Sequence, residues 1–313
     1  MRVSIFAGGL YTTLTARILP LAKMLNSLGI NCDIIIPIDW DSIAKGKPRN
    51  ILSTILTYSI ESCIREVVDS TDVVIIGRTS NLQAYLLEKI LRRRKCKMIF
   101  DLDDALFLPV SKIFGISMRP GSFWLEPIVK DADFITVCSH YLLDYVRQFN
   151  QNATIVHVPI DVDLFNPAYN RHYGKRTIGW QGNPVAHYEN LKILVRPLER
   201  IAQEYDIRFK IASYFGLLWV KQMFKKIEMS AEVDYGLDHW VPPDKFAQLI
   251  YDFDIMVAPL KKIPWNEGKS ALRVGIGMAM GIPVVSSPVG EQKYVIKHGI
   301  NGFLAKNEDE WYN

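Results

Sequence analysis

Cysteine is scarce in this chain, and its spacing excludes two kinds of site. The 313 residues include only four cysteines, Cys32, Cys63, Cys96 and Cys138. No two of them have the close spacing of a zinc site or a redox motif. Three of them lie inside or beside apolar runs, where buried free thiols are common. We therefore expect reduced thiols and a reducing compartment, the cytoplasm.

Long apolar runs and binding modules for nucleic acids are also absent. No apolar run is long enough to cross a bilayer. The apolar start at 3–7 is soon interrupted by Gly8 and Gly9, so we expect no signal peptide. The aromatic residues are scattered, and the net charge of +4 is mild. We therefore expect no nucleic-acid partner, whereas an anionic small molecule or a membrane surface suits this charge.

The sequence has the alternation of a two-domain α/β protein. Its 313 residues are too many for one ordinary core, and apolar runs alternate with amphipathic stretches. The first half predicts strands at 3–7, 32–37, 73–77, 98–101, 134–138 and 155–158, and helices at 12–28, 81–91 and 141–149. The second half predicts strands at 177–180, 208–212, 231–235, 255–258, 283–286 and 302–305, and helices at 190–204, 243–251 and from Gly268 on.

This order predicts two doubly wound Rossmann-like domains that face a cleft. A proline-bounded segment at 159–167, followed by a polar stretch, marks the junction. We therefore expect an N-terminal domain at 1–168 and a C-terminal domain at 169–313. The last residues resemble the start of another helix, so we expect the C-terminus to be truncated.

The most informative stretch is 265–290. A turn at Gly268 is expected to open a helix that carries Lys269 and Arg273 one turn apart on the same side. A helix N-terminus offers unpaired N–H groups and a positive dipole end, so two added cations would bind a diphosphate. The alternative is an ordinary solvated face. Because 274–280 carries no charge, we favour the diphosphate, and hence group transfer from a nucleotide-activated donor.

Several passages resemble glycosyltransferase family 4, a family of GT-B enzymes that use nucleotide sugars and mostly retain anomeric configuration. These passages lie at 131–139, 158–165, 235–260, 281–290 and 298–304. The resemblance implies that the first domain binds an acceptor and that the second binds the donor. It also implies polysaccharide biosynthesis, a glycan or lipid-linked acceptor, no cofactor beyond the nucleotide sugar and no bound metal.

The resemblance also assigns residues to the donor site. Lys269 and Arg273 match the basic pair that holds the donor pyrophosphate. Gly182 matches the glycine loop that opens the donor domain, although a simple turn at the end of a strand explains it equally well. Gly8 and Gly9 match the first-domain loop that lies under the donor. Independently of the resemblance, Asn183 and His187 flank the opening of the second domain, within reach of a donor phosphate.

One departure from the family concerns acidic residues. Members commonly carry a spaced pair of glutamates here, and the second binds the nucleotide ribose. The second position is occupied by Ile276, whereas Glu267 lies one residue from the first. We expect Glu267 to contact the donor sugar and Glu291 to line the donor pocket, and the ribose contact must come from elsewhere.

Acidic residues also follow the predicted strand at 98–101. Asp101, Asp103 and Asp104 would lie at the carboxyl end of a parallel strand. They suit binding of an acceptor hydroxyl, general-base catalysis, a metal site or simple helix capping, and a metal fits GT-B enzymes least. We favour an acceptor-side catalytic role for Asp103 and Asp104.

The leading interpretation is a glycosyltransferase, and two other classes compete with it. The missing ribose glutamate favours a catalytically inactive nucleotide-sugar-binding scaffold. A dehydrogenase is disfavoured, because Gly8 and Gly9 are not part of a full dinucleotide fingerprint. The basic run at 92–97 is either a solvated helix end or a site of peripheral membrane contact.

Overall fold

The computed structural model describes residues 1–7, 17–35, 71–77, 82–93, 96–108, 111–113, 116–118, 120–170, 174–239 and 241–313. The chain divides into two compact units. Unit 1 comprises Met1–Pro159 together with Gly268–Ser270, and unit 2 comprises Ile160–Glu267 and Ala271–Asn313. Each unit contains its own six-stranded sheet.

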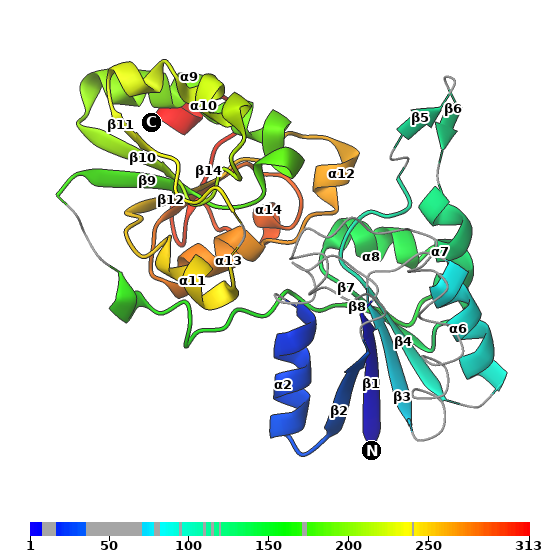
Figure 1. Ribbon diagram of the computed structural model, residues 1–313. Coiled ribbons are helices and arrows are strands. Elements are labelled where there is room, and N and C mark those ends of the chain that lie inside the picture. Colours follow the sequence, from blue (N-terminus) through cyan, green and yellow to red (C-terminus); the bar gives the residue numbers. More distant parts are fainter. Residues whose placement is uncertain are drawn as a thin grey trace. The chain divides into compact units, whose positions relative to one another are not determined.

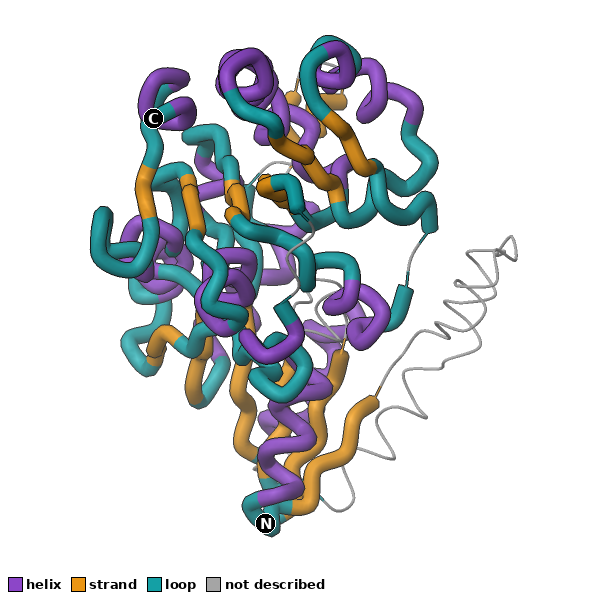
Figure 2. Tube along the Cα trace, turned by 90° about the vertical axis from the view of Figure 1, so that its left-hand side faces the viewer, coloured by secondary structure: helices purple, strands orange, loops and turns teal. Residues whose placement is uncertain are grey.

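All neighbouring strands in the sheet of unit 1 are parallel. The strands in spatial order are β2 (Asn31–Ile35), β1 (Arg2–Ala7), β3 (Val73–Gly77), β4 (Lys97–Leu102), β7 (Phe134–Val137) and β8 (Ala153–Ile155). The helices are α2 (Leu19–Ser27), α6 (Leu82–Arg93), α7 (Pro120–Asp131) and α8 (His140–Val146), and a short hairpin joins β5 (Ser111–Ile113) to β6 (Ile116–Met118). Strands and helices of this unit run side by side in Figures 1 and 2.

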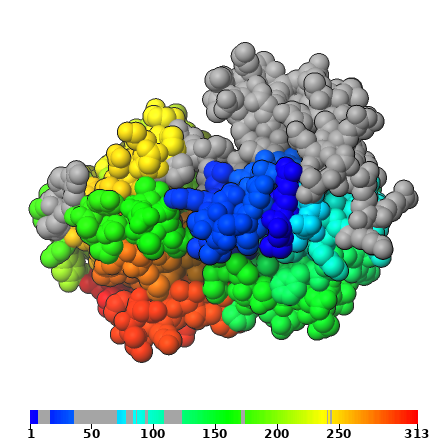
Figure 3. Space-filling view, turned by 90° about the horizontal axis from the view of Figure 1, so that it is seen from below, coloured from blue at the N-terminus to red at the C-terminus, as the bar shows by residue number. Residues whose placement is uncertain are grey.

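The core of unit 1 forms because its strands are apolar and its helices are amphipathic. Ile5, Ile75 and Cys32 from three neighbouring strands pack with Ile18 and Ala22 beside and within α2. The outer side of α2 leaves Leu19 and Met24 exposed, and the C-cap residue Leu28 is exposed as well. This part of the chain is the blue surface in Figure 3.

The sheet of unit 2 is also wholly parallel. Its strands in spatial order are β11 (Glu232–Asp234), β10 (Ile207–Ile211), β9 (Arg176–Trp180), β12 (Ile255–Ala258), β13 (Val284–Ser286) and β14 (Phe303–Leu304). The helices are α9 (Pro184–Glu204), α10 (Leu218–Phe224), α11 (Pro243–Gln248), α12 (Pro264–Glu267), α13 (Leu272–Ala279), α14 (Gln292–Val295) and α15 (Glu308–Tyr312). In Figure 1, α9 and α10 cover one face of this sheet, and α11 and α13 cover the other.

Side-chain alternation along the strands gives unit 2 two cores. Trp180 of β9 and Phe209 of β10 face one core, which they share with Leu191 of α9. Met256 of β12 faces the second core together with Val274 and Ile276 of α13. Successive residues of a strand point to opposite faces, so one sheet supplies both cores.

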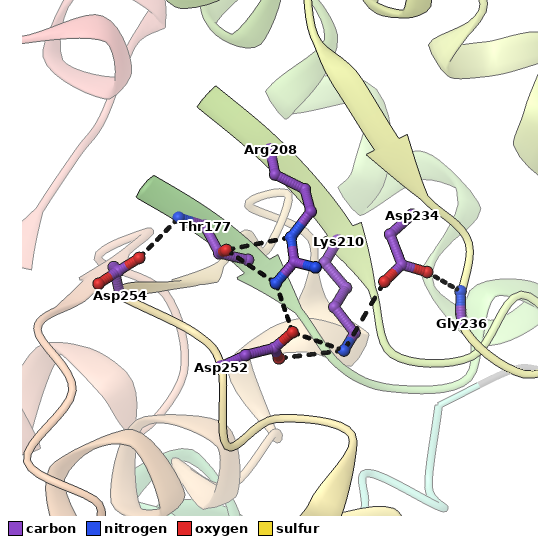
Figure 4. Close-up of polar contacts among 7 residues, drawn as sticks. All are labelled: Thr177, Arg208, Lys210, Asp234, Gly236, Asp252 and Asp254. Carbon is purple, nitrogen blue, oxygen red and sulfur yellow. Dashed lines mark hydrogen bonds and ion pairs between the residues drawn. The ribbon is translucent and has the colours of Figure 1, made fainter. Parts of the chain in front are cut away.

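The alternate positions of β10 carry charge and form a buried network (Figure 4). Asp252 accepts from Lys210 with both carboxylate oxygens at 3.0 Å and forms an ion pair with Arg208. Arg208 also donates to Thr177 Oγ1, at 3.1 Å from Nε. The network lies at the amino ends of β9 and β12, because Thr177 is near the start of one strand and Asp252 precedes the other.

The predicted fold class is confirmed, with two doubly wound units of parallel strands. The observed bounds of some elements differ from the predicted ones, because contacts between distant residues set them. The strand predicted at 155–158 is Ala153–Ile155, because it pairs with 135–137 of β7. Helix α9 begins at Pro184, six residues before the predicted start, with Asn183 as its N-cap. Helices α7 and α10 were not predicted.

Ser139 was predicted as the N-cap of the helix that follows it. It caps α8, with its hydroxyl accepting from the backbone N–H of Leu142. Across the described ranges, no helix combines the length and the apolar character needed to cross a membrane.

Candidate donor-binding site

The candidate site in unit 2 begins where β9 ends. Trp180 is the last residue of β9, and Gln181, Gly182 and Asn183 lead into α9. Gly182 has a φ of +147°, a backbone conformation that favours glycine. The side chain of Asn183 accepts from the backbone N–H of Val185 at 3.0 Å, so it caps the helix. The N-terminus of a 21-residue helix therefore lies directly after the glycine.

Arg273 lies against this turn. It is the second residue of α13, and its Nε donates to the backbone oxygen of Gln181 at 2.6 Å. Its guanidinium carbon lies 5.5 Å from the centroid of the Trp180 ring. A Cβ atom on Gly182 would lie 2.5 Å from Nη2 of Arg273. The glycine is therefore needed for the guanidinium to approach the backbone so closely.

The charge of Arg273 is poorly solvated, and no carboxylate of the described residues neutralises it. Desolvation lowers the pKa of its guanidinium to about 10, so it remains protonated at neutral pH. Within the described part of the chain, no carboxylate forms an ion pair with it. A desolvated cation without a counter-ion gains strongly from an anion, because the local dielectric constant is low.

Two further donors belong to the same turn. Trp180 is fully buried and Gln181 is 5% exposed. Neither Nε1 of Trp180 nor Nε2 of Gln181 has a hydrogen-bond partner among the described residues. A buried donor without an acceptor costs free energy. Two buried donors without an acceptor among the described residues thus lie close to Arg273, which suits an anion.

The two predicted glutamates lie in and near the loop after β13. Glu267, at the end of α12, accepts from the backbone N–H of Gly290 at 3.2 Å and from Lys293 Nζ at 3.0 Å. Glu291 is 1% exposed and precedes α14. Ile276 is buried in α13 and belongs to its core. Glu267 thus contacts the backbone of Gly290, the residue directly before Glu291.

The prediction that Lys269 and Arg273 lie one turn apart on one helix is wrong. Residues 268–271 are not helical, and α13 begins only at Leu272. Gly268–Ser270 pack with unit 1, where a Cβ on Gly268 would lie 2.9 Å from Cβ of Ala105. This long-range packing interrupts the helix, and only Arg273 lies in its first turn.

In unit 1, Lys269 meets the predicted acidic cluster. Its Nζ donates to Asp104 at 2.8 Å, and the Asp104 carboxylate is buried. Asp101 is occupied by Arg17, which donates two hydrogen bonds of 2.6 Å to its carboxylate. Both oxygens of the Asp101 carboxylate are therefore engaged in a buried ion pair.

Cys138 lies beside these acids. Its thiol donates to the backbone oxygen of Asp103 at 3.2 Å, and burial raises the pKa of the thiol well above its usual value. A neutral buried thiol of this kind packs and donates a weak hydrogen bond, and it does not act as a nucleophile.

Two groups of sequence-predicted site residues therefore emerge. Gly182, Asn183 and Arg273 meet in unit 2, while Asp103, Asp104, Gly268 and Lys269 belong to unit 1. Gly8 and Gly9 lie outside the described residues. The donors on Trp180 and Gln181 were missed. The only signal was a glutamine placed directly after a buried strand, which the pattern alone does not distinguish from a turn.

Gly182→Ala tests the close approach of Arg273. The new Cβ would displace the guanidinium, so we expect affinity for nucleoside diphosphates to fall about 10-fold or more, the equivalent of one lost charge-assisted hydrogen bond. Isothermal titration calorimetry measures this change.

Gly174→Ala is the matched control. Gly174 also has a positive φ, +70°, but a Cβ there meets no atom within 4 Å. It should cost about 1–2 kcal/mol of stability and leave affinity unchanged. Equal affinities for the two variants and the wild type would contradict the role given to Gly182.

The comparisons with known proteins agree with this fold. Residues 175–313 match the family model described as "Glycosyl transferases group 1". No curated protein matches the chain in sequence.

Solved structures resemble the chain over almost its whole length. A glycosyltransferase from Rickettsia africae ESF-5 is 14% identical with a TM-score of 0.70, over 99% of this chain and 85% of that one. Sucrose-phosphate synthase from Thermosynechococcus elongatus is 14% identical with a TM-score of 0.70, over 99% of this chain and 87% of that one. Anabaena Alr3699/HepE in complex with UDP and glucose is 13% identical with a TM-score of 0.64, over 99% and 87%. All share the GT-B arrangement of two Rossmann-like domains.

Proposed function

We propose that this chain, a glycosyltransferase whose residues 175–313 form a domain of the glycosyl transferases group 1 family, uses a nucleotide-diphosphate sugar as donor and a glycan or lipid-linked molecule as acceptor. The observation that carries the proposal is the desolvated guanidinium of Arg273 beside the N-terminal turn of α9. The UDP bound by the Anabaena structure supports a nucleotide of this class.

The chemistry follows from the charge that develops during transfer. The bond between the anomeric carbon and the diphosphate oxygen breaks, and a bond to an acceptor hydroxyl oxygen forms. Negative charge grows on the departing diphosphate. Donors already aimed at that charge stabilise the transition state without reorganisation. Arg273, Gln181 Nε2 and the N–H groups at the start of α9 would serve as such donors.

Retention of the anomeric configuration is part of the proposal. The acceptor would attack on the face that the diphosphate leaves, and the acceptor proton would pass to a phosphate oxygen. No protein nucleophile is then required. An inverting enzyme would need a general base, for which Asp103 and Asp104 are the candidates. Proton NMR of the product anomer, compared with that of the donor, distinguishes the two outcomes.

The ion pair with Lys269 refines the role of Asp104. A carboxylate that accepts from an ammonium at 2.8 Å is suited to position that lysine. We therefore assign Asp104 to holding Lys269 and retain Asp103 as the acceptor-side candidate. This ion pair lies within unit 1, which contains both residues.

A thermal-shift panel tests the proposed function. We expect one group of nucleoside diphosphates and their sugars to raise the melting temperature. A ligand at 100 times its Kd stabilises the folded protein by about 2.7 kcal/mol. Free nucleosides should give a much smaller shift, because they lack the diphosphate. The proposal would be contradicted if no nucleoside diphosphate changed the melting temperature.

Turnover distinguishes an enzyme from an inactive scaffold. The scaffold is the alternative suggested by Ile276, which stands where family members carry the ribose-binding glutamate and is buried in the core. The donor that gives the largest shift is incubated with the wild type and with Lys269→Ala, and release of nucleoside diphosphate is measured. Release by the wild type that is lost in the variant supports transfer. Tight binding without release, with or without added acceptor glycans, would favour the scaffold.

A further inference from the structure

A chain of buried hydrogen bonds beside Arg273 fixes the orientation of Asn190. Asn190 lies in α9 and is 3% exposed. Its side-chain oxygen accepts from the backbone N–H of Lys261 at 2.8 Å and from Asn266 Nδ2 at 2.9 Å. A backbone N–H is only a donor and cannot be reversed. The oxygen of Asn190 must therefore face Lys261, and its amino group must face the other way.

The amino group of Asn190 faces His187. Nδ2 of Asn190 lies 2.8 Å from Nδ1 of the imidazole. Because Nδ2 is a donor, Nδ1 must accept, and it carries no proton. A neutral imidazole holds its proton on the other nitrogen. Lys261, through Asn190, thus assigns the Nε2–H tautomer to His187.

In this tautomer the Nε2–H group of His187 is a second hydrogen-bond donor beside Arg273. Nε2 of His187 lies 2.6 Å from Nη2 of the guanidinium. Neither group can accept from the other, since a guanidinium has no lone pair to offer. The two nitrogens are so close that one oxygen within hydrogen-bond reach of both would accept from both. Because that place is next to the Gly182 turn, a phosphoryl oxygen fits it best.

We propose that His187 is a ligand of the donor diphosphate, and that its Nε2–H donates, together with Arg273, to one phosphoryl oxygen. This assignment rests on the proposed function of the site. The imidazole ring is held in a fixed orientation, because His187 is 7% exposed and its ring lies edge-on to Trp180 with centroids 6.0 Å apart. A donor held in place before binding loses little entropy when the ligand arrives.

The test compares two substitutions of His187. His187→Leu removes the donor and should weaken binding of UDP and of inorganic pyrophosphate about 10- to 100-fold, the effect of one charge-assisted hydrogen bond. His187→Gln can place an N–H near the former Nε2 and should recover most of the affinity. Binding of free uridine should be the same in all proteins, because it has no phosphate. Isothermal titration calorimetry gives these affinities.

The control is His239→Leu. His239 lies in the same unit, its side chain is 65% exposed, and it pairs with Asp238. This substitution should leave both affinities unchanged. Circular dichroism and melting temperature show whether the His187 variants fold, and His187→Gln keeps the test valid if His187→Leu does not.

Nitrogen-15 NMR tests the tautomer in the ligand-free protein. The chain has only six histidines, so loss of one signal set in His187→Gln assigns the resonance. We expect Nε2 to carry the proton and Nδ1 to be the bare nitrogen. A proton on Nδ1 would overturn the inference.

The outcomes separate this inference from the proposed function. If the wild type binds neither UDP nor pyrophosphate, and no other nucleoside diphosphate, the proposed function fails and the inference fails with it. If the wild type binds and both His187 variants bind equally well, only the role of His187 is wrong.

Discussion

Replacing Arg273 with methionine is expected to lower kcat/KM about 10²- to 10³-fold, the usual effect of losing one donor that stabilises a developing oxyanion. The free protein should hardly be destabilised. The variant loses one hydrogen bond to Gln181, but it also removes a desolvated charge that has no carboxylate ion-pair partner within the described residues. We expect its melting temperature to stay within about 4 °C of the wild type. The shift induced by nucleoside diphosphates should disappear.

This combination is diagnostic because most buried substitutions reduce stability and activity together. Arg196→Met is the control, since Arg196 lies in α9 and its side chain is 79% exposed. It should change neither kcat/KM nor the ligand-induced shift. Initial rates with the donor found in the panel, and melting curves with and without that ligand, provide the readouts. A normal shift in Arg273→Met would place the diphosphate elsewhere.

Arg273→Lys adds a second level to the same experiment. Lysine keeps the charge but lacks the planar fork, which donates to Gln181 through Nε and leaves other N–H groups for the proposed phosphate. We expect intermediate affinity and a kcat/KM closer to that of Arg273→Met than to the wild type. A fully active lysine variant would show that charge alone suffices.

The sheets were predictable from sequence because their signal is local. β3 and β12 occur where continuous apolar runs placed them, and both are buried in parallel sheets. The N-cap at Ser139 could also be predicted from the sequence, whereas the start of α9 at Asn183 and Pro184 was not predicted. Each of these features depends on a few neighbouring residues.

The candidate site was predictable only in part, because its geometry depends on packing between distant residues. Arg273 was identified from helix chemistry, and it does lie in the first turn of α13. The interruption before that helix was not, since it depends on Gly268 meeting Ala105. The tautomer of His187 depends in turn on a backbone N–H that lies 71 residues from Asn190 in sequence. No pattern within one segment contains such information.

Replacing Asp252 with alanine is expected to lower the free energy of unfolding of unit 2 by about 3–5 kcal/mol, the usual cost of breaking a buried ion pair from one side. The carboxylate of Asp252 is 9% exposed and serves both Arg208 and Lys210 (Figure 4). Without it, the two cations in the sheet keep Thr177 and the more distant Asp234 as their polar partners among the described side chains. Urea denaturation followed by tryptophan fluorescence measures the change, since most of the tryptophans belong to unit 2.

Asp206→Ala is the matched control, because Asp206 pairs with Lys175 but is 74% exposed, so its loss should cost less than about 1 kcal/mol. Adding Lys210→Met to Asp252→Ala removes one of the two uncompensated cations and should recover part of the loss. The network lies at the amino ends of the strands, whereas Arg273 contacts the residues that follow the carboxyl end of β9. Folded Asp252→Ala should therefore bind nucleoside diphosphates as the wild type does. Weaker binding by that folded protein would mean that the charged network and the anion site are coupled through β9.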